Sequence, residues 1–353
     1  MTVAGTLRYG TEVDFHGWTH GDRVRQASFQ CPREDKPTTD VGREVKTMSS
    51  VNTSASARRK HAAVKKAPAS LAGVTLTHPE RVYWADAGVT KRDLAEFYQA
   101  VWQWMRPHVA GRPIALLRCP QGVGAECFFQ KHASAGIATE HLHQVREKGD
   151  KIISIDNLDG LIALVQAGVL EIHVRGTTVD DRERADRLVF DLDPGPGTTW
   201  RDVVAAAREV RKRLGQLKLT SFVKTTGGKG LHVVLPIKPT PWDKAKDFAR
   251  AIAVAMAHDA PDRYIATATK AKRGKRIFID YLRNSREATA VAPYSTRARP
   301  GAAVSTPVEW SELGSLKSAG QYTVKNLKVR LARLRKDPWG DIGRLKQVLP
   351  KLK

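Results

Sequence analysis

The sequence predicts an α+β fold over residues 71–353. Short β-rich segments and amphipathic helical segments occur there in irregular order, and several β-rich segments follow each other directly. A parallel α/β sheet would show regular alternation of strands and helices instead. The chain has 353 residues, of which 41% are hydrophobic, and this is enough to form a sizeable core.

Several segments have apolar residues at helical spacing. The first follows Thr90, which forms a capping-box pattern with Asp93, and the second and third end near Gly168 and Gly215. A basic helix is expected close to the C-terminus. The expected helices cover 91–105, 158–165, 200–214, 248–256 and 324–336, and the fourth is expected to open near Pro241.

Between the helices, runs of apolar and β-branched residues predict short strands. Most are bounded by polar or glycine-containing segments, as strands usually are. The expected strands cover 114–118, 170–174, 188–192, 221–224, 231–235 and 277–281.

The first 70 residues differ from the rest. Residues 1–37 alternate like three short strands, which are too few to fold alone. Residues 38–70 are rich in Thr, Ser, Ala, Lys and Arg without periodicity, which predicts a disordered basic linker. We therefore expect an N-terminal fragment (1–37), a linker (38–70) and one folded domain (71–353).

The formal net charge of +23 points to a polyanionic partner, with nucleic acid first. The excess is concentrated in 41–70, 263–299 and 317–353, which carry +6, +8 and +9. A membrane partner is disfavoured, because no basic amphipathic helix with a strong apolar face stands out and no apolar run reaches about 18 residues.

The cysteines predict neither a disulfide framework nor a zinc site. There are three, Cys31, Cys119 and Cys127, and none shows Cys-x-x-Cys spacing. A reducing cytosol is the simplest location.

An acidic pair follows an apolar strand. Asp191 and Asp193 are two residues apart, so on a strand they share a face, and two adjacent carboxylates favour a divalent cation. Asp280, on the apolar segment 277–281, supplies a third carboxylate. Three carboxylates from two strands are the usual ligands of a two-metal phosphoryl-transfer site, although Asp280 could pair with Arg283 instead.

A glycine-rich loop covers residues 226–230 and is flanked by basic side chains. Its glycines let backbone N–H groups approach a phosphate, and Thr226, Lys229 and His232 add donors. It is not a Walker A loop, since the lysine is not followed by Ser or Thr and β-rich residues come next. The alternative is an ordinary hairpin turn.

Other candidates are weaker. His173 lies in an apolar strand and is either structural or a ligand. Phe128 and Phe129 are either core residues or a stacking platform for bases. Arg297 and Arg299 either clamp a phosphate or are surface charges.

In this order, the motifs at 191–194, 227–232 and 278–284 resemble those of the polymerase domain of bacterial DNA ligase D. That domain belongs to the archaeo-eukaryotic primase superfamily and serves non-homologous end joining. The resemblance extends from about Leu71 to the C-terminus. It implies a primase-polymerase fold with mixed or antiparallel sheets, flanking helices and an RRM-like catalytic core.

The resemblance also implies an activity and its ligands. It indicates a template-directed nucleotidyltransferase that fills gaps and extends DNA ends, uses two Mn²⁺ or Mg²⁺ ions and favours ribonucleoside triphosphates. Gapped duplexes with a 5′-phosphate are the implied substrates, and the Ku protein is a further implied partner.

Residue roles follow from the same resemblance. Asp191, Asp193 and Asp280 match metal ligands, and Arg81 and Lys91 match the pair that binds a downstream 5′-phosphate. Phe128 and Phe129 match the aromatic pair that stacks at the template break. The nucleotide-binding positions are matched by His173, Thr226, Lys229, His232, Arg283 and Arg297.

Several positions depart from the family pattern. Thr226 stands where the family commonly has Ser, and Arg81 stands where it prefers Lys. Where the family usually has tryptophan after the Glu171-Ile172-His173 segment, Arg175 stands here. Residues 1–37 resemble the end of the ligase oligonucleotide-binding domain, but the chain has no Lys-x-Asp-Gly motif. We therefore expect no ligase activity.

Two other functions remain open. A non-catalytic module that binds DNA ends would use the same basic patches without metal. A nucleotide-sugar transferase would also use Asp-x-Asp, but the charge of +23 disfavours it.

Overall fold

The computed structural model describes residues 10–14, 28–33, 69–132, 136–147 and 149–351. The chain divides into two units, Met1–Lys65 and Lys66–Lys353. In the first unit, β1 (Gly10–Asp14) pairs antiparallel with β2 (Ser28–Arg33). The remaining expectations for 1–37, and most of the expected linker, lie outside the described residues.

The second unit opens with short paired strands. β3 (Ala69–Leu71) pairs with β4 (Val74–Leu76), and β5 (Val82–Trp84) pairs with β6 (Val89–Thr90). β3 begins two residues before the expected boundary at 71.

In the described part of the chain, short 3₁₀ helices cover Thr139–His141, Lys270–Lys272, Leu282–Asn284 and Glu312–Gly314.

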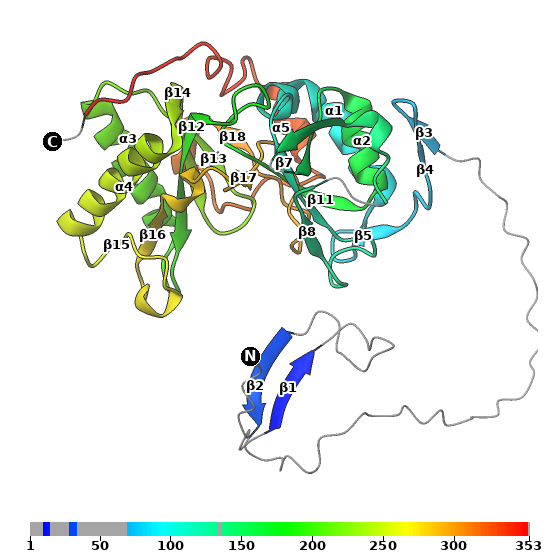
Figure 1. Cartoon of the computed structure of the whole chain (residues 1–353), viewed down its shortest axis with the longest axis horizontal. Coiled ribbons are helices and arrows are strands. Elements are labelled where there is room, and N and C mark those ends of the chain that lie inside the picture. Colours follow the sequence, from blue (N-terminus) through cyan, green and yellow to red (C-terminus); the bar gives the residue numbers. More distant parts are fainter. Residues whose placement is uncertain (1–9, 15–27, 34–68, 133–135, 148, 352–353) are drawn as a thin grey trace, which may run out of the picture. The chain divides into compact units, whose positions relative to one another are not determined.

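The first of two large sheets has the order β17-β11-β7-β10-β9, with β8 also paired to β7, and all its pairs are antiparallel. Helices α1 (Lys91–Val109) and α2 (Leu158–Gln166) pack against it and share its hydrophobic core (Figure 1). Its strands are β7 (Ile114–Arg118), β8 (Phe128–Gln130), β9 (His143–Glu147), β10 (Asp150–Ser154), β11 (Val169–Val174) and β17 (Ala290–Val291).

The second large sheet has the order β15-β16-β12-β14-β13-β18. In this sheet β15 and β16 run parallel to each other, and all the other neighbouring strands run antiparallel. Helices α3 (Trp200–Gln216) and α4 (Trp242–Asp259) pack against it and form a second core. Its strands are β12 (Arg184–Pro194), β13 (Phe222–Thr225), β14 (Leu231–Pro241), β15 (Tyr264–Ile265), β16 (Ile277–Asp280) and β18 (Pro307–Val308).

The chain order β12-α3-β13-β14-α4-β16 combines with the spatial order β16-β12-β14-β13. This is the βαββαβ arrangement in which two antiparallel βαβ halves interlock. The α+β prediction is confirmed, and the central four strands have the topology expected of an RRM-like core.

Element boundaries differ from prediction where tertiary contacts extend an element. β12 and β14 pair with each other over most of their lengths and are longer than the expected strands. α4 starts directly after Pro241, where its opening was expected, and continues three residues past the expected end at Met256. α3 continues through Gly215, and the left-handed residue after it is Lys218, with φ of 61°. The C-terminal helix α5 (Leu327–Arg333) is shorter than expected.

The capping box at the start of α1 is confirmed. Thr90 N donates to Asp93 Oδ2 at 2.8 Å, and Asp93 N donates to Thr90 Oγ1 at 3.2 Å. Among the described residues, no helix combines the length and apolar character needed to cross a membrane.

Candidate active site

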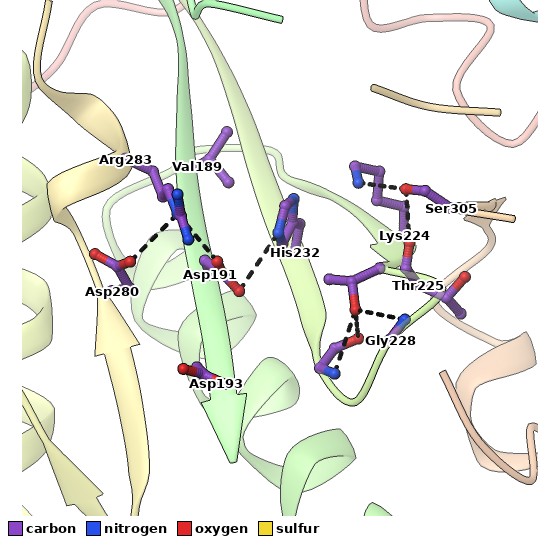
Figure 2. Close-up of polar contacts among 12 residues, drawn as sticks. Val189, Asp191, Asp193, Lys224, Thr225, Gly228, His232, Asp280, Arg283 and Ser305 are labelled. Atoms are coloured by element: carbon purple, nitrogen blue, oxygen red, sulfur yellow. Dashed lines mark hydrogen bonds and ion pairs between the residues drawn. The ribbon is translucent and has the colours of Figure 1, made fainter. Parts of the chain in front are cut away.

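The three aspartates expected to bind metal lie on one face of the second sheet. Asp191 and Asp193 are two residues apart on β12, so their side chains share a face. Asp280, the last residue of β16, lies directly opposite Asp191 in the antiparallel register. The sheet thus brings together carboxylates from distant parts of the chain (Figure 2).

Two arginines pair with these carboxylates. Arg283 Nε lies 3.2 Å from Asp191 Oδ2 and 3.3 Å from Asp280 Oδ2, and Arg273 pairs with Asp193. Arg283 was expected from the sequence as a nucleotide-binding residue, whereas Arg273 was not expected at this site. The only sequence signal for Arg273 is the basic run 270–276 just before β16.

Arg283 is positioned by its neighbour Asn284. The buried Asn284 amide accepts from Val189 N at 2.7 Å and donates to Val189 O at 2.9 Å. These two bonds attach the 3₁₀ turn 282–284 to β12, so the guanidinium of Arg283 projects over the aspartates.

The pKa values of Asp191 and Asp280 shift in opposite directions. Burial alone would raise the pKa of Asp191, but His232 and Arg283 outweigh it and hold that pKa well below its usual range. Burial raises the pKa of Asp280, and the negative charge of Asp191 adds to this although Arg283 opposes it. Neighbouring carboxylates commonly separate in this way.

The carboxylates fit a divalent metal by the chemistry of their donors. Within the described residues no group of three His, Cys, Asp or Glu side chains is already arranged to hold a metal ion. However, carboxylate oxygens are the ligands that Mg²⁺ and Mn²⁺ prefer. Arg283 also shows that a cation is stable between Asp191 and Asp280. A divalent metal would compete with Arg273 and Arg283 for the aspartate oxygens.

The glycine loop joins β13 to β14 as a hairpin turn. The Thr226 hydroxyl donates to Gly230 O at 2.9 Å and accepts from the N–H groups of Gly228 and Gly230 at 3.2 and 3.3 Å. A Cβ at Gly230 would lie 2.1 Å from Leu192 O, so only glycine fits there. Thr226 therefore organises the loop, while Lys229 is exposed at its tip.

His232 follows the loop and lies beside Asp191. Its Nε2 is 3.4 Å from Asp191 Oδ1, and its side chain is buried. Burial, together with the nearby Lys224, lowers the pKa of His232 to about 4 despite the attraction of Asp191. The imidazole is thus neutral near pH 7.

Glu171 connects the two large sheets. Its Oε2 lies 2.8 Å from His173 Nε2 and 3.0 Å from Arg297 Nε, and Arg297 Nη1 donates to Thr226 O at 2.7 Å. Burial would raise the pKa of Glu171, but His173 and Arg297 lower it to about 2. Glu171, which the sequence analysis did not single out, orients two of the expected nucleotide ligands.

Most of the expected site residues line one cavity of about 490 Å³, whereas Asp280 and Glu171 lie outside its lining. A volume of this size suits a nucleotide-sized ligand. Cationic side chains outnumber acidic ones in its wall, which suits a polyanion. The charged and imidazole groups that line it are His173, Asp191, Asp193, Lys229, His232, Arg273, Arg283, Arg297 and Arg299.

The pair expected to bind a 5′-phosphate lies apart from this cavity lining. Arg81 Nη1 donates to Pro120 O at 2.8 Å. Lys91 is 3% exposed, and its Nζ donates to Thr77 O at 2.9 Å and to Gln166 O at 3.3 Å. Burial, with a further contribution from Arg81, lowers the pKa of Lys91 to about 8.

Phe128 and Phe129 on β8 are exposed, so the core alternative is wrong for both: 43% and 63% of their surfaces are accessible. The Phe129 ring lies edge-on to His173, with ring centroids 5.6 Å apart, and the Arg118 guanidinium covers Phe128 at 5.3 Å. The aromatic pair therefore borders the active site, and Phe129 is the more exposed of the two rings.

All of the expected site residues except Arg81 lie in a stretch that matches a known family. Residues 90–339 match the family described as LigD, primase-polymerase domain. The chain belongs to this family.

Similar proteins agree with this assignment. The LigD protein of Pseudomonas aeruginosa is 38% identical over 343 residues, which is 95% of this chain and 40% of that protein. The LigD protein of Mycolicibacterium smegmatis is 36% identical over 68% of this chain and 32% of its own length. The chain thus spans well under half of these relatives.

A solved structure matches the fold. The polymerase domain of Mycobacterium tuberculosis ligase D, in complex with DNA, superposes with a TM-score of 0.68 at 33% identity. The match covers 74% of this chain and 94% of that one. The expected primase-polymerase fold is therefore confirmed.

At the position where LigD primase-polymerase domains usually have tryptophan, Arg175 takes part in a buried ion pair. Its Nη1 lies 2.7 Å from Glu147 Oε2, and both side chains are at most 10% exposed. The pair joins the end of β11 to the end of β9.

The expectation of no disulfide was wrong. Cys119 and Cys127 form a disulfide with their Cα atoms 4.4 Å apart. The sequence shows only an eight-residue separation, whereas β7 and β8 pair antiparallel and bring the two residues together at the strand ends. The disulfide closes the loop that carries Pro120, the acceptor for Arg81.

Proposed function

We propose that this chain is a metal-dependent nucleotidyltransferase that extends DNA ends and fills gaps during non-homologous end joining. One observation carries the proposal: three aspartates share the face of a sheet beside a cation-rich cavity that includes a glycine loop. Carboxylates serve a polymerase by holding divalent metals, and a cationic cavity serves it by holding a triphosphate.

Asp191, Asp193 and Asp280 would hold two Mn²⁺ or Mg²⁺ ions. Such ions activate the attacking 3′-hydroxyl and neutralise charge on the leaving pyrophosphate. Arg273 and Arg283, which pair with these aspartates in the structure, would then turn towards the triphosphate.

The remaining cavity groups would orient the nucleotide. Lys229 at the loop tip and Arg297 beneath the loop supply positive charge, and His173 is held by Glu171. His232 stays neutral beside Asp191, so one of its ring nitrogens would donate a hydrogen bond and the other would accept one. Groups fixed in this way align the α-phosphate with the attacking hydroxyl.

The DNA would contact the neighbouring surface. Exposed Phe128 and Phe129 offer stacking faces at a template break. Arg81 and Lys91 offer a pair of cations for a downstream 5′-phosphate. The solved domain from M. tuberculosis was determined with DNA, which supports this part of the proposal.

Family membership supports three further parts. Ribonucleoside triphosphates are the favoured substrates, the Ku protein is a partner at DNA ends, and the site of action is the bacterial cytoplasm at the nucleoid. Each follows from the resemblance to DNA ligase D.

The test is primer extension on a gapped duplex with a 5′-phosphate, in Mn²⁺, comparing ribo- and deoxynucleotides. Asp193→Ala should abolish extension while DNA affinity is retained. Asp247→Ala, which removes an exposed aspartate on α4, is the matched control and should behave as wild type.

Full extension by the Asp193→Ala protein would refute the proposal. A wild-type protein that binds DNA ends but incorporates no nucleotide with any divalent metal would identify a non-catalytic end-binding module instead.

A further inference from the structure

A row of four side chains crosses the second sheet at the level of the active site. Asp280 lies opposite Asp191, Asp191 opposite His232, and His232 opposite Lys224, on β16, β12, β14 and β13. Directly opposite residues share a face of a sheet, so all four point to the same side. Figure 2 shows the row ending at Lys224. The proposed function uses the first three and assigns nothing to the fourth.

Lys224 is an unusual residue for this position. It is 2% exposed, and its Nζ donates one hydrogen bond, at 2.6 Å, to Ser305 Oγ. Within the described part of the chain it has no ion pair. Burial and the nearby Arg297 lower the pKa of Lys224 well below its usual range. Burying an amine with one partner is less favourable than burying an apolar side chain of similar length. Packing alone therefore does not explain a lysine here.

The partner of Lys224 belongs to the segment on which the glycine loop rests. Ser305 Oγ donates to Thr225 O at 3.0 Å, and Thr225 N donates to Thr306 O at 2.9 Å. Gly227 has a φ of +66°, and a Cβ there would lie 3.2 Å from Ser305 N. The loop backbone thus touches the segment 304–306 directly.

Gly227 also packs against Arg297, one of the cationic side chains that line the cavity. A Cβ at Gly227 would lie 2.8 Å from Arg297 Cγ, and Arg297 Nη1 donates to Thr226 O. A shift of the segment 304–306 would therefore displace both the loop N–H groups and Arg297. Lys224 is attached to this segment through Ser305.

We propose that Lys224 is a positioning residue for the incoming nucleotide. Through Ser305 it holds the segment 304–306 against the glycine loop and keeps the phosphate-binding groups in place. It acts through Ser305 and does not itself contact the nucleotide. This inference rests on the proposed function and adds a residue to the same site.

The test is Lys224→Met, which keeps the chain length and removes the hydrogen-bond donor. The KM for the nucleoside triphosphate should rise by up to about tenfold, as expected when one buried hydrogen bond is lost. The kcat at saturating nucleotide and the affinity for gapped DNA should not change. Titration calorimetry with ATP and Mn²⁺ should show the same loss of affinity directly.

Two further variants separate positioning from stability. Ser305→Ala should raise the nucleotide KM in the same direction, and Lys224→Met/Ser305→Ala should be no worse than the stronger single variant, because both act through one contact. Lys238→Met, which removes an exposed lysine of β14, is the matched control and should leave the nucleotide KM unchanged. The Tm of Lys224→Met should equal or exceed that of wild type, because methionine suits an apolar site.

The inference is overturned if Lys224→Met leaves the nucleotide KM unchanged. It is also overturned if nucleotide KM, kcat, DNA affinity and Tm all deteriorate together, since Lys224 would then be a structural residue only. A wild-type protein that neither incorporates nor binds nucleotide would overturn the proposed function and this inference with it.

Discussion

Arg273 forms an ion pair with Asp193, the most exposed of the three aspartates. Because the guanidinium competes with a divalent metal for this carboxylate, its removal should favour the metal. We predict that Arg273→Met lowers the Mn²⁺ concentration for half-saturation by up to about fivefold, the range expected for a partly exposed ion pair. Electron paramagnetic resonance of free Mn²⁺, without nucleotide, measures this. Lys275→Met, which removes an exposed neighbouring cation, should have a much smaller effect. Weaker Mn²⁺ binding by Arg273→Met would contradict the prediction.

We predict that Lys91 makes DNA binding dependent on pH. Its pKa is lowered to about 8, so its positive charge is present below pH 8 and is lost as pH rises through that value. The affinity for a gapped duplex with a 5′-phosphate should therefore fall between pH 7 and 9, as measured by fluorescence anisotropy. Lys91→Arg keeps the charge and should remove most of this dependence. An equal pH dependence on DNA without the 5′-phosphate would show that Lys91 is not its cause.

Phe129 is 63% exposed, so truncating it leaves almost no cavity in the core. We expect Phe129→Ala to keep the Tm of wild type and to weaken binding to gapped DNA by about tenfold, since stacking of one base on an aromatic ring contributes roughly 1–3 kcal/mol. Val254→Ala, at an exposed apolar position on α4, is the control. A normal DNA affinity for Phe129→Ala would remove the stacking role.

Glu171 links stability to pH. Burial opposes its ionisation, but His173 and Arg297 lower its pKa from 4.5 to about 2, so the folded state binds fewer protons than the unfolded state between these values. The stabilising contribution is present above pH 4.5 and is lost as pH falls towards 2. Urea unfolding from pH 5 to pH 3 should show this loss. Glu171→Gln should be less stable at pH 7 and should lose less stability over that range, whereas Asp247→Asn should follow wild type.

The disulfide between Cys119 and Cys127 has a direct chemical test. After alkylation without reductant, peptides containing these two cysteines should be recovered as one linked species, and reduction should separate them. Free thiols at both positions in protein purified without reductant would contradict the structure. Reduction should also weaken the preference for a 5′-phosphate, because the loop carries the carbonyl that orients Arg81.

Local sequence patterns were sufficient for much of the fold. The Thr90–Asp93 capping box depends on neighbouring residues only, and it formed as predicted. The opening of α4 near Pro241 was also predicted from the sequence. The length of β12 was underestimated, because pairing with β14 extended it beyond its own periodic segment. The disulfide was missed for a related reason: cysteine spacing carries no information about which strand ends meet.

The sequence by itself determined the α+β class, the basic charge, the Asp-x-Asp pair and the glycine loop, because each depends on residue type and short-range spacing. Only the tertiary structure decided what these groups contact. The register of β16, β12, β14 and β13 placed Asp280 opposite Asp191 and Lys224 at the end of the same row. The packing of the segment 304–306 against the glycine loop gave Lys224 its partner. Such contacts join residues far apart in the chain, and they follow from how whole sheets pair and pack.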